Sequence, residues 1–292
     1  MSALPPPFCT PRPEVLFELP PLPAQAAEQP IGLARRLWQR DGMRQLLVLA
    51  VIALAWELAA RWAGNDLLLP GFLQAAAAWW DDLRNGELLA RTGISLALLL
   101  QGYGLGIALA LALSAAAVAT RTGRDVLSAL TSLFNPLPAI ALLPLALLWF
   151  GLGQGSLVFV LVHAVLWPVA LATLSGFQGV PETLRMAGRN YGLTGLRYVL
   201  QILVPSALPA ILSGLRIGWA FAWRTLIAAE LFFGASSGRG GLGWYIFQSR
   251  NELMTDKVFA GLATVVLIGW VAERLVFDTA ERLTVRRWGM QR

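Results

Sequence analysis

The sequence predicts an all-α, polytopic membrane protein with about six transmembrane helices. Of its 292 residues, 57% are hydrophobic and 14% are charged, whereas a soluble domain has roughly 45–50% apolar and about 25% charged residues. The mean hydropathy is +0.61. Apolar runs recur along the chain at the length of about twenty residues that lets a helix cross a bilayer. These observations exclude a soluble globular enzyme, and the high hydrophobicity excludes disorder of the whole chain.

A proline-rich tail precedes the first apolar run. Residues 1–30 hold nine of the 17 prolines, and four arginines follow within residues 35–44. No apolar segment follows a basic start here, so the tail is not a signal peptide. Such a composition predicts an extended tail without a packed core.

Six apolar runs follow and are the predicted transmembrane helices. Their approximate bounds are residues 45–63, 92–120, 126–150, 156–177, 206–233 and 258–277. The third run contains Pro136, Pro138 and Pro144, and prolines within a membrane helix free backbone groups that must be satisfied inside protein. Between the runs we expect a polar external segment over residues 64–91 and a glycine-rich loop over residues 234–257.

Basic residues set the predicted orientation. With the N-terminus inside, the inside segments hold thirteen arginines and the outside segments hold six basic residues. This asymmetry agrees with the excess of basic residues in cytoplasmic loops. Six crossings return the C-terminus to the inside, so both termini are predicted to be cytoplasmic. The net charge of +6 is therefore attributed to membrane topology, and we expect contact with lipid and no nucleic acid.

The segment 180–205, which this orientation puts in the cytoplasm, is polar yet helical in pattern. Ala187 and Gly188 are small and allow close approach of another surface, and Gly192 allows a sharp reversal between two short helices. Two interpretations stay open. The segment docks on another protein, or it is an amphipathic connection that lies on the bilayer surface.

The same segment resembles the EAA loop of the permease subunits of ABC importers, with the pattern E-A-A, three residues, G, nine residues, I-x-L-P. The matching positions in this sequence are Met186, Ala187, Gly188, Gly192, Ile202, Val204 and Pro205. Methionine replaces the glutamate, glycine the second alanine and valine the leucine, while the glycine and proline are kept. The resemblance implies that this loop engages a separate ATPase.

Residues 223–230 and 281–290 resemble the nitrate/sulfonate/taurine branch of these permeases, and the likeness covers roughly residues 85–290. It implies a type I ABC importer permease-like fold in the inner membrane. The implied partners are two copies of an ABC ATPase, a second permease copy in a homodimer, and a periplasmic or lipid-anchored substrate-binding protein. The implied solutes are small anions or zwitterions such as nitrate, bicarbonate, taurine and sulfonates.

The expected organisation has four parts. Residues 1–44 form the basic tail, and residues 45–84 form the first transmembrane helix with an external segment. Residues 85–280 form the permease domain with its docking loop, and residues 281–292 form a basic cytoplasmic end.

The chain lacks a nucleotide site of its own. A Walker A motif needs a lysine after glycine to reach the phosphates, and the only lysine, Lys257, follows Asp256. If transport uses ATP, a partner chain must therefore bind it, and we expect neither a cofactor nor catalytic residues here. His163 is the only histidine, so no metal site is expected.

Charged residues inside a membrane span are costly and indicate function. Of the two charged residues Arg224 and Glu230 in the fifth run, Arg224 lies nearer the middle and Glu230 closer to the end. Arg224 facing the pathway and attracting an anionic substrate is one hypothesis. The alternative is a structural ion pair with another span. Arg224 and Glu230 are the candidate pathway residues.

Two other classes of function stay open. An ATP-independent secondary transporter would show repeated halves and more ionisable groups in its spans. A membrane-embedded enzyme would need clustered carboxylates, histidines or serine–base pairs, but the chain has one histidine and isolated carboxylates. The subunit of an ATP-driven importer is the prediction that agrees best with the sequence.

Overall fold

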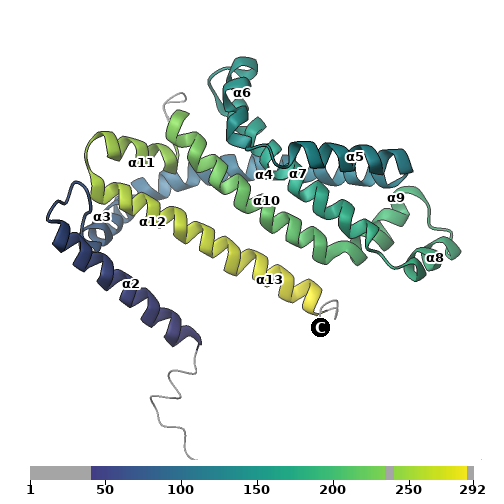
Figure 1. Ribbon diagram of the computed structural model, residues 1–292, viewed down its shortest axis with the longest axis horizontal. Helices are drawn as coiled ribbons and strands as arrows, with labels where there is room; N and C mark the ends of the chain where they lie inside the picture. The colour runs from purple at the N-terminus through teal and green to yellow at the C-terminus, as the bar shows by residue number, and fades with distance from the viewer. Residues whose placement is uncertain (1–40, 234–239, 288–292) are drawn as a thin grey trace, which may run out of the picture. The chain divides into compact units, whose positions relative to one another are not determined.

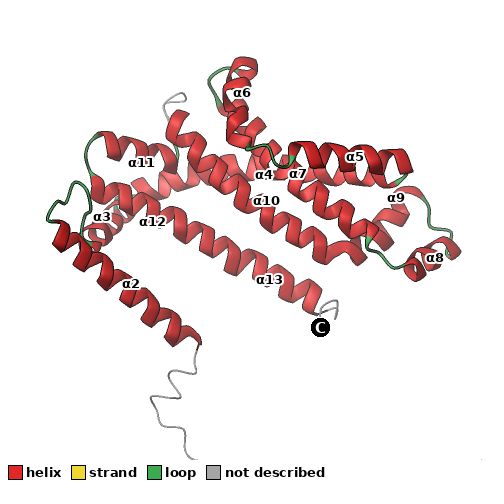
Figure 2. Ribbon diagram, in the orientation of Figure 1, coloured by secondary structure: helices red, strands yellow, loops and turns green. Residues whose placement is uncertain are grey.

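A computed structural model of the chain describes residues 41–233 and 240–287, and every regular element among them is a helix (Figures 1 and 2). The elements are α2 (Asp41–Ala63), α3 (Phe72–Arg84), α4 (Glu87–Val118), α5 (Arg121–Phe134), η1 (Ala139–Leu142), α6 (Leu143–Phe150), α7 (Gln154–Gln178), α8 (Glu182–Asn190), α9 (Gly195–Tyr198), η2 (Val199–Leu203), α10 (Val204–Phe233), α11 (Leu242–Asn251), α12 (Thr255–Val271), η3 (Ala272–Phe277), α13 (Asp278–Glu281) and η4 (Arg282–Arg286). The first short element, η1, is a 3₁₀ turn, and the other three η elements are π-helical.

The chain divides after Ile52 into two units. The first unit is described only over the first half of α2, which is helical and apolar. All contacts described below belong to the second unit, residues 53–292.

Five helical stretches are long and apolar enough to cross a membrane. They are Gly42–Ala63, Glu87–Val118, Gln154–Gln178, Gly195–Phe232 and Thr255–Val285, and a sixth is added if the bent pair α5 and η1–α6 counts as one span. The prediction of an all-α, polytopic membrane fold is confirmed.

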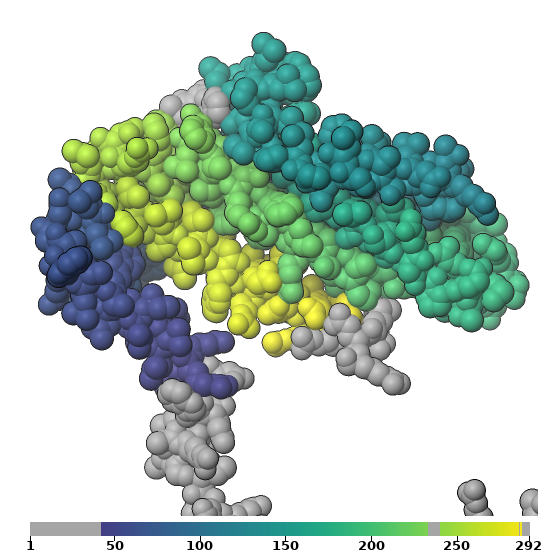
Figure 3. All heavy atoms as spheres, in the orientation of Figure 1, coloured from purple at the N-terminus to yellow at the C-terminus, as the bar shows by residue number. Residues whose placement is uncertain are grey.

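The third predicted span is interrupted at its prolines, as its sequence indicates. α5 ends at Phe134, η1 begins at Ala139, and the helices on the two sides of this break are bent by 88°. Pro136 and Pro138 cause the break, because proline lacks an amide hydrogen and disfavours the α conformation in the residue before it. Pro144 is tolerated because it lies in the first turn of α6. Figure 3 shows η1 and α6 projecting from the rest of the second unit.

Two of the segments between the predicted spans contain helices. α3 lies in the expected external segment, and α11 lies in the expected glycine-rich loop, of which residues 234–239 fall outside the described residues. α11 carries Leu242, Tyr245 and Ile246 into the hydrophobic core. Burial of these side chains stabilises a helix that is too short and too glycine-flanked to stand out in the sequence.

The core of the second unit forms where α7 packs against both α4 and α10. Glycines make this approach close. A Cβ on Gly106 of α4 would lie 2.7 Å from the Cβ of Val165 in α7, and a Cβ on Gly214 of α10 would meet Ala172 of α7. These glycine pairs, Gly102/Gly106 and Gly214/Gly218, therefore serve packing within one chain, as small residues do between membrane helices.

Leucine at position 106 is expected to destabilise the protein by about 1–3 kcal/mol, because the added side chain overlaps α7. Leucine at Gly104 is the matched control, since a Cβ there meets nothing within 4 Å. The measurement is the thermal unfolding of the two purified variants in one detergent. Equal melting temperatures would contradict the close packing of α4 on α7.

The buried carboxylate of Asp82 links α3 to α11 and α12 through hydrogen bonds. Asp82 accepts hydrogen bonds from the Tyr245 hydroxyl and from Lys257 Nζ, the latter at 3.1 Å. Burial and the hydrogen bond to Asp82 raise the pKa of Tyr245, so its hydroxyl stays protonated and remains a donor. Trp79 Nε1 adds a bond of 3.0 Å to Thr264 Oγ1. Lys257, the only lysine of the chain, therefore stabilises the packing of α12 on α3.

Candidate functional site

The 180–205 segment forms two helices joined by a tight turn, α8 and then α9 with η2. Gly192 has φ +70°, a left-handed conformation that glycine adopts without steric cost. The amide of Leu193 donates to the carbonyl of Gly188 at 3.0 Å, and the amide of Gly192 donates to that of Arg189 at 2.9 Å. This pair of bonds is a Schellman motif. The predicted reversal at Gly192 is present.

Arg185 fixes the position of α8 on the end of α7. Its Nη2 donates to the carbonyl of Phe177 at 2.6 Å, and its Nε donates to that of Val180 at 3.0 Å. The last carbonyls of a helix have no partner within the helix, so the guanidinium satisfies them.

Gly188 faces the second helix of the segment, formed by α9 and η2. It is buried, and a Cβ at this position would lie 3.0 Å from Ile202 Cγ1 and 3.0 Å from Tyr198 Cε2. A small residue is needed here so that α8 can pack on α9 and η2. Ala187 is half-buried beside it. The small size of Gly188 thus lets the two helices pack closely, in addition to any role toward another protein.

The outward face of α8 and its turn is partly apolar. The exposed fractions are 49% for Met186, 43% for Leu184 and 85% for Tyr191. Glu182 and Arg189 are exposed beside them and lie 4.0 Å apart. Exposed apolar groups with a charged rim fit a protein contact, and they also fit the surface of a bilayer.

The second helix of the segment continues without a break into the next membrane helix. The chain is helical from Gly195 to Phe232. In η2 the amide of Val204 donates to the carbonyl of Val199, five residues back. Pro205 has no amide hydrogen, and its ring would clash with the carbonyl four residues back. A widened π turn directly before it is a known way to accommodate such a residue.

Arg224 lines a cavity of about 340 Å³ at the break between α5 and η1. The other walls come from α7 and α10. Arg224 is exposed, its Nε donates to Ala220 of its own helix at 3.1 Å, and its guanidinium lies 5.6 Å from the centre of the Phe221 ring. No ion pair joins Arg224 to a carboxylate in the part of the chain that the structure describes. The predicted ion pair with another span is therefore not formed within this part.

Glu230 lies apart from this cavity, in the packing of α10 against α4 and α11. It is 3% exposed. Its carboxylate accepts hydrogen bonds from Ser95 Oγ and from the amide of Gly243, each at 2.8 Å, and the Ser95 hydroxyl accepts from the amide of Leu242 at 2.8 Å. The structure does not bring Glu230 and Arg224 together.

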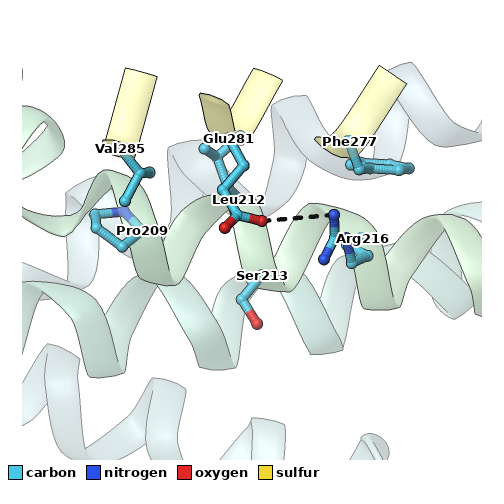
Figure 4. Close-up of a pocket in the computed structure, with 7 residues that line it drawn as sticks. All are labelled: Pro209, Leu212, Ser213, Arg216, Phe277, Glu281 and Val285. Carbon is cyan, nitrogen blue, oxygen red and sulfur yellow. Dashed lines mark ion pairs between the residues drawn. The ribbon is translucent and has the colours of Figure 1, made fainter. Parts of the chain in front are cut away.

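Arg216 bridges α10 to the helical stretch 255–286. Its Nη2 lies 2.7 Å from Asp278 Oδ1 and 3.6 Å from Glu281 Oε2, and its Nε lies 3.2 Å from Glu273 Oε1. Figure 4 shows Arg216 reaching Glu281 over a cavity of about 170 Å³. Three carboxylates around one guanidinium explain how this charge is accommodated on an apolar helix.

Sequence reasoning missed Ser95 as well as Arg185. Ser95 and Glu230 are 135 residues apart, and a lone serine in an apolar run has no periodic signal. Arg185 was counted only as a cytoplasmic charge. The one local indication of its structural role is its position in the first turn of α8, shortly after α7 ends, because an arginine there can reach the last carbonyls of α7.

These elements define a multi-pass α-helical membrane protein with a cavity at the bend of a broken helix and a helical pair between two spans. The profile of the family described as binding-protein-dependent transport system inner membrane component matches residues 102–283. The chain belongs to this family, and it is an inner-membrane, multi-pass transport permease.

Named relatives agree with this assignment. The chain is 30% identical over 247 residues to a putative ABC transporter permease protein of Methanocaldococcus jannaschii, covering 83% of this chain and 91% of that one. It is 33% identical over 239 residues to the putative aliphatic sulfonates transport permease protein SsuC of Escherichia coli, covering 81% and 87%. It is 35% identical over 163 residues to the taurine transport system permease protein TauC of Escherichia coli, covering 56% and 58%. The prediction of an ABC importer permease of the nitrate/sulfonate/taurine branch is confirmed.

Proposed function

We propose that this chain forms the pathway of an ATP-driven importer for a small anionic or zwitterionic solute of the nitrate, sulfonate, taurine or bicarbonate type. Both termini and the 180–205 segment lie in the cytoplasm, where Met186, Ala187, Gly188, Gly192, Ile202 and Pro205 belong to the surface that engages a separate ATPase, present in two copies. A second copy of the chain completes the pathway, and a periplasmic or lipid-anchored binding protein delivers the solute. The names of the relatives support the solute class.

The position of Arg224 carries the proposal. It lies nine residues before the end of α10, about 14 Å along the helix, and thus near the middle of a hydrocarbon core about 30 Å thick. The side chain is exposed on the second unit and has no carboxylate partner among the described residues. A charge at this depth faces protein or a water-filled path, because facing lipid is costly. We therefore assign this face to the pathway, closed by the second copy.

The helix from Gly195 to Phe232 links the two candidate sites. Its first turns belong to the 180–205 segment, and Arg224 lies about 39 Å further along, at 1.5 Å per residue from Tyr198. A continuous helix transmits displacement along its axis. In the proposed cycle, closure of the nucleotide-bound ATPases moves α8 and α9 and thereby shifts the pathway end of α10.

Glutamine at position 224 is expected to lower ATP-driven uptake of a small anion at least about tenfold, since a charge-assisted interaction is worth roughly 1.5–3 kcal/mol. The measurement is uptake of labelled taurine, ethanesulfonate and nitrate into proteoliposomes that contain the complex and its binding protein. Arg224→Lys should retain part of the uptake. Arg61→Gln, at an exposed arginine, is the matched control.

Two results would contradict the proposal. Full uptake by Arg224→Gln in an intact complex would remove Arg224 from the pathway. Equal uptake of the anions with and without ATP would indicate a secondary transporter and would leave the 180–205 segment as a surface connection.

A further inference from the structure

The cavity beside Arg224 has a wall of unpaired polar groups. Both ring nitrogens of His163, Nε1 of Trp167 and Oδ1 of Asn135 are buried and form no hydrogen bond with the rest of the described chain. All three residues line this cavity. Buried polar groups are nearly always paired in proteins, and an unpaired one is costly. Four of the eight such atoms among the described residues belong to residues that line this cavity, and this concentration points to a ligand.

His163 of α7 and Arg224 of α10 both line this cavity. The helices α7 and α10 run antiparallel, since Gly176 of α7 faces Ala207 of α10 whereas Gly218 of α10 faces Val165 of α7. Continued along the helices, this register puts His163 level with about residue 220 of α10, so Arg224 lies about one helical turn, roughly 6 Å, further along the axis. The cation and the unpaired donors therefore surround one cavity, about one turn apart.

We infer that this cavity binds one small monovalent oxyanion through Arg224, with Trp167 and His163 donating to its oxygens. The inference rests on the proposed pathway role of Arg224. The cavity lining has one cationic side chain, Arg224, and no carboxylate. Arg224 therefore balances one negative charge on the ligand. A second negative charge on the ligand would be left unpaired in an apolar surrounding. Leu137, Ile140 and other apolar residues of the lining suit a short alkyl tail.

Phe134 covers the donors in the described conformation. It is the last residue of α5, its ring stacks on Trp167 with centroids 4.9 Å apart, and it meets His163 edge-on at 6.4 Å. The helix breaks directly after Phe134, so its ring is less constrained than a ring in the middle of a helix. Binding of the oxyanion displaces this ring from the donors.

His163 gives the site a single spectroscopic probe, because it is the only histidine of the chain. The full chain is purified on a histidine-free tag, together with its copurifying subunits, and placed in lipid nanodiscs. It is labelled at the histidine Cε1 and titrated with ethanesulfonate. Among the labelled histidines of the complex, we expect one ring resonance, the one absent from a His163→Gln preparation, to shift saturably. Ethyl methyl sulfone, a neutral analogue of similar shape, and sulfate, a dianion, should shift it at least about tenfold more weakly.

Two variants separate binding from folding. Arg224→Gln should weaken ethanesulfonate binding about tenfold or more, and Trp167→Phe, which keeps the ring that stacks on Phe134, should weaken it about threefold to tenfold. No shift in the wild type, an equal shift with the neutral sulfone, or an unchanged affinity in Arg224→Gln would each overturn the site. ATP-driven uptake measured on the same preparation tests the proposed function separately: uptake without a His163 shift rejects only this site.

Discussion

Valine in place of Gly192 is expected to abolish ATP-driven uptake while the protein still reaches the membrane. Gly192 has φ +70°, and a β-branched residue held in that region is strained by about 1–3 kcal/mol. The turn would relax by leaving the left-handed conformation, which breaks the two hydrogen bonds that close α8 and turns α8 away from α9. Uptake should fall at least about tenfold, because 1.4 kcal/mol is a factor of ten in an equilibrium. The measurements are uptake, ATP hydrolysis and the amount of ATPase that copurifies.

Gly64→Val is the matched control for this experiment. Gly64 has φ +59° and open space around its Cα, so valine imposes a similar strain at a turn outside the 180–205 segment. The control should retain uptake and the copurifying ATPase. If Gly192→Val transports as well as Gly64→Val does, the 180–205 segment does not couple to the ATPase.

Alanine in place of Glu230 is expected to prevent stable folding of the second unit. The change removes the carboxylate that accepts from Ser95 and from the amide of Gly243 and leaves these donors buried among α4, α10 and α11. A buried donor left without an acceptor costs about 1–3 kcal/mol, and here two donors lose theirs. Thermal unfolding in detergent and the yield of monodisperse protein measure the effect.

Glu252→Ala is the control, since Glu252 is exposed and its carboxylate accepts a hydrogen bond from the nearby Gln248 side chain. Glu230→Gln keeps the shape of the side chain and one acceptor, so it should lie between the wild type and Glu230→Ala. A Glu230→Ala protein as stable as Glu252→Ala would mean that α11 is held by its apolar residues alone. If Glu230→Ala were stable but lost uptake, Glu230 would belong to the pathway instead.

The sequence by itself determined the features that depend on local composition. The run 92–120 is apolar and uncharged, so it forms a membrane helix wherever it packs, and α4 follows it closely. Gly192 marked a reversal because only glycine fits a left-handed turn without strain. Arg224 and Glu230 stand out in the fifth apolar run because a charge in a bilayer needs a partner or water.

The tertiary structure alone decided which groups meet. The bend after Phe134 depends on two prolines that the sequence shows, yet its 88° angle also depends on the packing of η1 and α6 on α7. Ser95 satisfies Glu230, and a trio of carboxylates surrounds Arg216. These partners come from distant helices. A local sequence pattern indicates that a buried charge needs a partner. The three-dimensional packing of the helices decides which group that partner is. The energy of the pair depends on the distance between the two groups and on their burial, and not on their separation along the chain.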